Sequence, residues 1–98
     1  MQLATVVGQV VSTAKNPGLG SLTLLLVQDV DGVDGQPPLG SPYVAVDLVG
    51  AGDGELVLVP KGSAARVAGA TSQAPTDCAV VGIADSVVRN GQLTYRKS

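Results

Sequence analysis

The chain alternates between short apolar runs and clusters of Gly, Pro, Asn and Asp, a pattern that is typical of an all-β domain. Valine dominates the apolar runs, and its branched side chain packs well on a pleated sheet. The pattern predicts five strands and, after the turn "RNG", a short last one. They span Leu3–Val11, Leu22–Val30, Tyr43–Val49, Glu55–Val59, Ala79–Val88 and Gln92–Tyr95. Gly8 lies inside the first strand, where we expect a bulge or a sharp bend.

One segment differs from the strand pattern. In "GSAARVAGA", residues 62–70, alanines and an arginine follow a serine, which favours one short helix with Ser63 as its N-cap. Short strands at regular spacing around one small helix predict a five-stranded OB-like β-barrel. Ninety-eight residues are enough for one core, so we expect a single domain over residues 1–98.

Two of the predicted strands contain more apolar residues than a barrel of one chain needs. A barrel strand should alternate, with one face in the core and one face in water. The runs "LTLLLV" and "AVVGI" are apolar on both faces, and the chain is too short to supply a second layer. Soluble monomers seldom expose large apolar patches, so we expect another subunit to cover the outer face.

The composition excludes several kinds of chemistry. The chain has no His, which removes the usual general base near neutral pH and the commonest metal ligand. Its one cysteine, Cys78, can form neither an internal disulfide nor a cysteine zinc cluster, and we expect it to be a buried small apolar side chain. Phe and Trp are absent as well, so the core must consist of Val, Leu, Ala and Ile.

Charge and hydropathy predict a soluble, cytoplasmic protein. Six basic and eight acidic residues give a net charge of −2, whereas a surface that follows nucleic-acid phosphates needs clustered Lys and Arg. No apolar run approaches the ~20 residues of a membrane span, and the first residues lack the basic start of a signal peptide.

The segment "GAGDGE", residues 50–55, raises the question of a nucleotide site because three glycines lie within five positions. A dinucleotide-binding loop has the pattern G-x-G-x-x-G and opens a helix, and a P-loop ends in Gly-Lys-Ser/Thr. Here the glycines are spaced G-x-G-x-G and lead into a strand, without the helix N-terminus that holds a pyrophosphate. We therefore predict a tight turn.

The segment "DVDGVDG", Asp29–Gly35, resembles a calcium-binding loop only superficially. Counted from Asp29, the fifth, sixth and twelfth positions are Val33, Asp34 and Gly40, where an EF-hand has an acidic or amide ligand, glycine and glutamate. The pattern fails at these three places. Because Asp and Gly are natural turn residues, a solvated hairpin loop is the better interpretation.

No catalytic, cofactor or metal residue is predicted. Asp47, Asp77 and Asp85 are scattered without the spacing of a paired-carboxylate catalyst. Ser63 and Arg66 would suit an anion at the start of the short helix, or alternatively a cap and an ion pair across a subunit interface. An OB-like binding module for an anionic or single-stranded nucleic-acid ligand is the alternative function, but two tyrosines and an acidic balance fit it poorly.

Four segments together resemble one known family. "MQLATVVGQVVSTAKNPGL", "LTLLLVQ", "VAVDLVGAGDGELVLVPKGSAAR" and "DCAVVGIADSV" are similar, in this order and over nearly the whole chain, to the CcmL/EutN vertex proteins of bacterial microcompartment shells. The resemblance implies an OB-like barrel that assembles as a homopentamer. Such pentamers fill the fivefold corners without which a sheet of hexagonal shell proteins cannot close. It further implies a structural protein of the shell in the cytoplasm, with hexameric shell partners and no enzymatic activity, cofactor, nucleic acid or membrane contact.

The resemblance also suggests roles for particular residues. Gly50, Ala51 and Gly52 would form a corner near the fivefold axis, where neighbouring backbones come close. Ser63 and Arg66 would help to fix the helix and a subunit contact. Family members often carry a basic residue near "GLGSLT", around Gly20–Thr23, which this chain lacks. The proline-rich loop "DGVDGQPPLGSP" is a hypothetical contact with neighbouring shell proteins. The number of subunits, five or six, and the kind of compartment stay open at this point.

Overall fold

Strands and the turns between them make up the described part of the protein, a computed structural model that describes residues 1–11, 22–61 and 78–97. The eight strands are β1 (Gln2–Val10), β2 (Thr23–Asp29), β3 (Tyr43–Asp47), β4 (Leu56–Val59), β5 (Ala79–Val80), β6 (Gly82–Ile83), β7 (Ser86–Arg89) and β8 (Gln92–Arg96). The predicted helix capped by Ser63 lies outside the described residues. Within these three ranges, no helix is long and apolar enough to cross a membrane.

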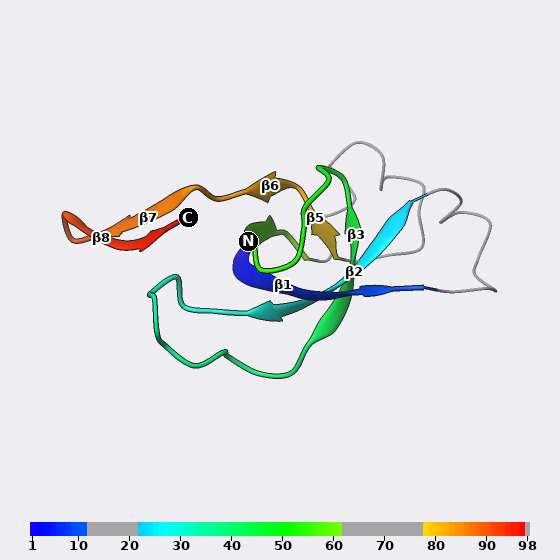
Figure 1. Cartoon of the computed structure of the whole chain (residues 1–98), viewed down its shortest axis with the longest axis horizontal. Coiled ribbons are helices and arrows are strands. Elements are labelled where there is room, and N and C mark those ends of the chain that lie inside the picture. The colour runs from blue at the N-terminus through cyan, green and yellow to red at the C-terminus, as the bar shows by residue number, and fades with distance from the viewer. Residues whose placement is uncertain (12–21, 62–77, 98) are drawn as a thin grey trace.

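Six of the strands form a sheet that curves round until its ends meet, as predicted for a small barrel. The strand order is β5-β3-β2-β1-β4-β6, and the pairs are antiparallel except for β3 with β5. The two outermost strands, β5 and β6, are separated in the chain by Val81 alone. One short chain segment therefore holds both edges of the sheet, and together β5 and β6 occupy the place of a fifth barrel strand (Figure 1).

The prediction of one continuous strand from Ala79 to Val88 is wrong, because this segment changes partners twice. Its first part pairs with β3, where Val46 lies opposite Ala79, and its second part pairs with β4, where Leu58 lies opposite Gly82. The backbone N–H of Val81 donates to the Leu58 carbonyl at 3.0 Å between the two. After Ile83 the chain leaves the barrel and forms a separate hairpin, β7–β8.

The bulge predicted at Gly8 is confirmed. Val6 pairs with Val27 and Gly8 pairs with Leu26, so Val7 is an extra residue in β1. A bulge of this kind bends a strand and increases its twist, which helps a short sheet to close. The side chain of Val7 is left on the surface, 46% exposed.

The core contains only small and medium aliphatic side chains, as the composition requires. Its buried members are Ala4, Val6, Leu25, Val27, Ala45, Val57, Val59 and Val80. They come from β1 to β5 and fill the inside of the barrel, with Ile83 and Tyr43 packed against them. Cys78 also packs against this cluster, although it is half-buried rather than fully buried as predicted.

The surplus apolar residues lie elsewhere than predicted. Leu24 is 9% exposed and Ala79 fully buried, so the single chain already covers much of the outer faces of β2 and β5. Exposed apolar side chains occur instead on β1, β3 and the hairpin, and also in the segments next to the strands. They include Val7, Val44, Val88 and Leu93.

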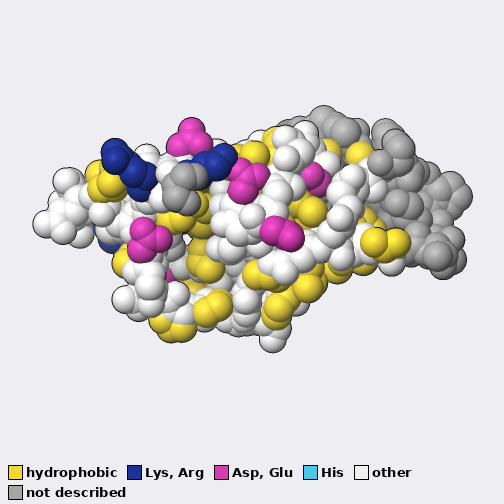
Figure 2. Space-filling view, viewed as in Figure 1, with side chains coloured by type: hydrophobic (Ala, Val, Ile, Leu, Met, Phe, Trp, Pro, Cys, Tyr) yellow, Lys and Arg dark blue, Asp and Glu magenta, His cyan; other side chains and the backbone are white. Residues whose placement is uncertain are grey.

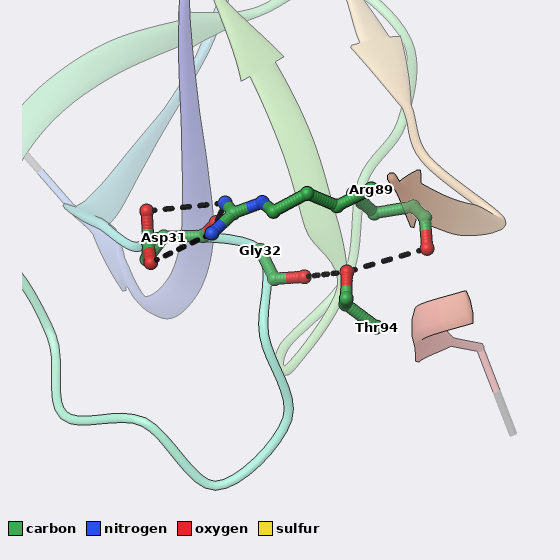
Figure 3. Close-up of polar contacts among 5 residues, drawn as sticks. Asp31, Gly32, Arg89 and Thr94 are labelled. Carbon is green, nitrogen blue, oxygen red and sulfur yellow. Dashed lines mark hydrogen bonds and ion pairs between the residues drawn. The ribbon is translucent and has the colours of Figure 1, made fainter. Parts of the chain in front are cut away.

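The β7–β8 hairpin projects from one end of the barrel and is fastened to the loop after β2 (Figure 1). Figure 3 shows the Arg89 guanidinium against the Asp31 carboxylate, with both N···O distances at 3.3 Å, while Nη2 also donates to the Asp31 carbonyl at 2.7 Å. The Thr94 hydroxyl lies 2.8 Å from the Gly32 carbonyl oxygen, to which it donates. The predicted tight turn is confirmed at the hairpin tip, where Asn90 and Gly91 have φ of 53° and 78°.

We expect Gly32→Ala to destabilise the fold more than Gly35→Ala, which serves as the matched control in the same loop. Both glycines have positive φ, 79° and 81°, where a side chain costs about 1–2 kcal/mol. At Gly32 an added Cβ would also lie 2.9 Å from Leu3 Cδ1, whereas nothing lies within 4 Å at Gly35. The Leu3 methyl group therefore has to shift to make room, which makes the loss at Gly32 the larger of the two. Urea unfolding at a fixed chain concentration measures both, and equal losses would contradict this packing.

Candidate functional site

The glycine corner between β3 and β4 is closed by the carboxylate of Asp47, the last residue of β3. Asp47 Oδ1 accepts hydrogen bonds from the backbone N–H groups of Val49 at 3.1 Å and Gly50 at 3.0 Å. The N–H of Ala51 donates to both carboxylate oxygens, at 3.3 and 3.1 Å. Gly50 makes this curl possible because its φ is 78°, a conformation that other residues rarely adopt.

Glu55 closes the other side of the same corner. Its Oε1 accepts a hydrogen bond from the Gly52 backbone N–H at 2.6 Å, and its Oε2 lies 2.7 Å from Lys97 Nζ. The ammonium group of Lys97 and the Gly52 N–H lower the pKa of the Glu55 carboxyl, while Glu55 raises the pKa of Lys97. The residue after β8 is thus tied to the corner.

These contacts decide what the corner can do chemically. A phosphate held by a glycine-rich loop needs free backbone N–H groups that point toward it. In this corner four consecutive N–H groups, from Val49 to Gly52, already bind carboxylates of the same chain. The corner is therefore a turn, as predicted, and the carboxylates that occupy its N–H groups leave no anion site there.

A second polar cluster joins β2, β3 and the end of β4. The Tyr43 hydroxyl donates to Asp29 Oδ1 at 2.6 Å, and Lys61 Nζ lies 3.1 Å from Asp29 Oδ2 and 4.3 Å from the centre of the Tyr43 ring. Burial and the neighbouring Asp29 carboxylate raise the pKa of the Tyr43 hydroxyl above its usual range. This cluster fixes strand ends, and its carboxylate already has two partners.

Two carboxylates, at the end of β2 and just after it, bind basic side chains of the chain itself. Asp29 binds Lys61, and Asp31 binds Arg89. In residues 1–11, 22–61 and 78–97, no three His, Cys, Asp or Glu side chains are grouped so that they could hold a metal ion. The loop also contacts the β7–β8 hairpin: the N–H of Asp34 donates to the Thr94 carbonyl of β8 at 2.9 Å.

The described surface has little in common with a nucleic-acid interface. Figure 2 shows the basic side chains beside acidic ones near the hairpin. Of Lys61, Arg89, Arg96 and Lys97, only Arg96 has no ion pair among the described residues. Tyr43 and Tyr95 are half-buried, so neither offers an open face for stacking a base.

A pocket of about 160 Å³ lies between the barrel wall and the loop after β2. Thr5 and Leu56 line it from the barrel, Tyr95 from the hairpin, and Val30 and residues 32–36 from the loop. Pockets for small molecules usually have about 300–1,000 Å³, so this one is small even for a compact metabolite.

The comparison with known proteins agrees with this fold. The profile of the family described as "Ethanolamine utilisation protein EutN/carboxysome" matches residues 1–85. The chain belongs to the EutN/CcmL family. The resemblance inferred from the four quoted segments is thereby confirmed.

Three members of the EutN/CcmL family illustrate the similarity. The carboxysome shell vertex protein CcmL of Synechocystis sp. is 53% identical over 98 residues, which cover 99% of this chain and 95% of the relative. The solved structure of CcmL from Nostoc sp. PCC 7120 has a TM-score of 0.89 and 47% identity, and covers 99% of this chain and 100% of that one. GrpN from Rhodospirillum rubrum, a pentameric microcompartment shell protein, has a TM-score of 0.77 and 46% identity, with 91% and 99% covered.

The structure brings together part of the predicted site. Gly50, Ala51 and Gly52 lie in one corner, with both glycines exposed and Ala51 packed against the core. Their place near a fivefold axis stays a prediction. Ser63 and Arg66 lie outside the described residues, and their role in a subunit contact stays a prediction too. Sequence analysis missed that Asp47 and Glu55 close the corner, although an acidic residue at each end of a glycine turn is a usable signal.

We expect Asp47→Ala to lower the free energy of unfolding by about 1–3 kcal/mol, because three backbone N–H groups lose a charged acceptor. The matched control is Asp53→Ala in the same corner, where the carboxylate is exposed and has no partner among the described residues. This change should stay within about 0.5 kcal/mol of the wild type. Urea unfolding measures both values, and hydrogen exchange should show faster exchange at residues 49–51 only in Asp47→Ala. Equal stability of the two variants would mean that Asp47 does not hold the corner.

We expect Lys97→Met to raise the pKa of Glu55 toward its ordinary value and to weaken the dependence of stability on pH. The folded-state pKa of Glu55 is lowered, so its contribution is present above the unfolded-state pKa and is lost as the pH falls through the folded-state pKa. A carboxyl titration followed by NMR gives the pKa directly. Lys61→Met, which removes the partner of Asp29, is the control and should leave Glu55 unchanged. An unchanged Glu55 in Lys97→Met would show that this ion pair does not form in solution.

Proposed function

We propose that this protein is a structural component of a bacterial microcompartment shell, in which five copies form a ring that fills a vertex. A shell of six-sided units stays flat unless fivefold units occur at its corners. A ring of five identical chains supplies this fivefold geometry and needs no catalytic or ligand-binding groups to do so. The protein would accordingly reside in a shell in the cytoplasm.

One observation carries this proposal: the full-length similarity to shell vertex proteins, one of which is pentameric. The relative from Rhodospirillum rubrum, described as a pentameric shell protein, covers 91% of this chain at 46% identity. At this level of identity the fold is the same, and the surfaces through which subunits meet can be retained. The exposed valines and leucine on β1, β3 and the hairpin give this chain apolar surface to bury in such a ring.

The glycine corner suits a position near the fivefold axis. At such an axis five copies of one segment approach each other, and small residues allow backbones to come close. Gly50 and Gly52 are exposed there, while Asp47 and Glu55 keep the corner in one conformation. We place Gly50, Ala51 and Gly52 at the rim of a central opening in the ring.

Hexameric shell proteins are the expected partners of the pentamer's outer edge. The loop at residues 31–42 has exposed apolar and proline residues, among them Leu39 with 48% exposure. Its first half is bonded to β8, and its second half is bonded to β2 through the Leu39 N–H and the Gly40 carbonyl. A Cβ added at Gly35 or Gly40 would still meet open space. This loop is our candidate for the contact with neighbouring shell proteins.

Catalysis and nucleic-acid binding receive no support from the described surface. At the corner, Asp47 and Glu55 bind backbone N–H groups, and Asp29 and Asp31 at and after the end of β2 bind basic side chains. No open aromatic platform is present among the described residues. A structural role fits these contacts better than an OB-like binding module does.

We expect the purified protein to have the native mass of five chains at micromolar concentration. Native mass spectrometry and light scattering measure this directly, and single-stranded DNA added to the sample should leave the mass unchanged. A monomer would refute the vertex assignment, and a salt-dependent complex with the DNA would favour a binding module instead.

A further inference from the structure

The β7–β8 hairpin has two apolar faces, of which the chain itself covers one. On the inner face, Val87 lies opposite Tyr95, and both side chains are half-buried. The methyl groups of Val87 point toward Gly32, where an added Cβ would lie 3.5 Å from Cγ1. The inner face thus packs on the loop after β2.

The outer face of the hairpin carries an apolar pair in open solvent. Val88 lies directly opposite Leu93, with exposures of 64% and 51%. Directly paired side chains on one face form a single contact surface. A two-stranded hairpin is marginal by itself, so an apolar pair on its free face is a liability unless another molecule covers it.

A second exposed apolar surface crosses the barrel wall from β1 to β3. Leu26 lies opposite both Gly8 and Val44, so these residues share the outer side of three neighbouring strands. Val44 is 44% exposed, and Val7 in the adjacent bulge is 46% exposed. Because Gly8 has no side chain, the surface beside Leu26 is depressed at this position. We call Val7, Gly8, Leu26 and Val44 the barrel row.

Both surfaces adjoin the glycine corner, but on different sides of it. Next to the barrel row, the Gly54 N–H donates to the carbonyl of Val6, the residue before Val7. Next to the hairpin, Lys97 directly follows β8 and pairs with Glu55. The hairpin lies at one end of the long axis, while β2 and β3 lie toward the other (Figure 1).

A closed ring requires two different surfaces on each subunit. In a ring every contact is heterologous: one patch of a subunit meets another patch of the next one. Two exposed apolar patches that flank the segment nearest to the axis are what such a contact requires. Neither patch carries a charged side chain, so their meeting leaves no buried charge without a partner.

From this placement, and building on the proposed pentamer, we infer that the hairpin is the arm that joins neighbouring subunits. The Val88–Leu93 pair of one subunit packs on the barrel row of the next, with Gly8 leaving room for the incoming side chain. The occupant of the hairpin's free face is thus a second copy of this chain, five times around the ring.

The first test is the charge variant Leu93→Asp, compared with Leu39→Asp on the exposed loop. A carboxylate in the apolar contact should raise the chain concentration needed for half-assembly by at least about tenfold, whereas Leu39→Asp should assemble like the wild type. Native mass spectrometry over a dilution series measures assembly, and circular dichroism verifies that both variants fold. A folded Leu93→Asp that assembles like the wild type overturns the inference while the vertex function stands. A wild type that is monomeric overturns both.

The second test asks directly whether the two surfaces meet. We expect the double variant Val44→Cys with Leu93→Cys to form, on mild oxidation, covalent multiples of the chain up to five. The matched control is Leu39→Cys with Leu93→Cys, which has equally exposed cysteines but places one outside the barrel row. It should yield no such ladder, nor should either single variant. The inference would be overturned if the double variant Val44→Cys with Leu93→Cys formed pentamers without cross-links. It would also be overturned if the control gave the same series of cross-linked multiples.

Discussion

The chain segment from Ala79 to Ile83 carries the closure of the barrel, because it is bonded to β3 at one half and to β4 at the other. Without it, the sheet β3-β2-β1-β4 would have two open edges, each a row of unpaired N–H and C=O groups. With it, two residues of each edge strand are paired, and the core of valines, alanines and Leu25 is enclosed.

This closure explains why large side chains are unnecessary. A five-stranded barrel with tight curvature leaves little space inside, and the core contains nothing larger than leucine apart from Tyr43 at its margin. The glycines permit the close approaches that curvature demands: at Gly82 an added Cβ would lie 3.1 Å from Leu58 Cδ1. The many small residues of this chain therefore have a packing role: they let strands approach each other closely in the tightly curved barrel.

Sequence reasoning predicted the barrel, the bulge at Gly8 and the turn character of the corner, because each depends on local pattern or on backbone freedom. It failed on the segment 79–88, where apolar alternation says nothing about which neighbour a residue pairs with. It also misplaced the exposed apolar surface: Leu24 looks like an outer residue in sequence but is buried by the folded chain, whereas Val44 is not. The closing contacts of Asp47 and Glu55 involve residues near in sequence and could have been anticipated. The contact of Lys97 with Glu55 spans distant segments and could not.

The contacts that hold the hairpin on the loop after β2 bear on the angle between adjacent subunits in the proposed ring. Two nitrogens of the Arg89 guanidinium bind Asp31, and the Thr94 hydroxyl donates to the Gly32 carbonyl. These contacts orient the hairpin within one subunit, before a neighbouring subunit binds. Association then resembles the docking of rigid bodies, with little conformational entropy left to lose. In the ring that we propose, the angle between adjacent subunits follows from the angle between arm and barrel within one subunit. The curvature of the shell at such a vertex would therefore be determined by the fold of the single chain.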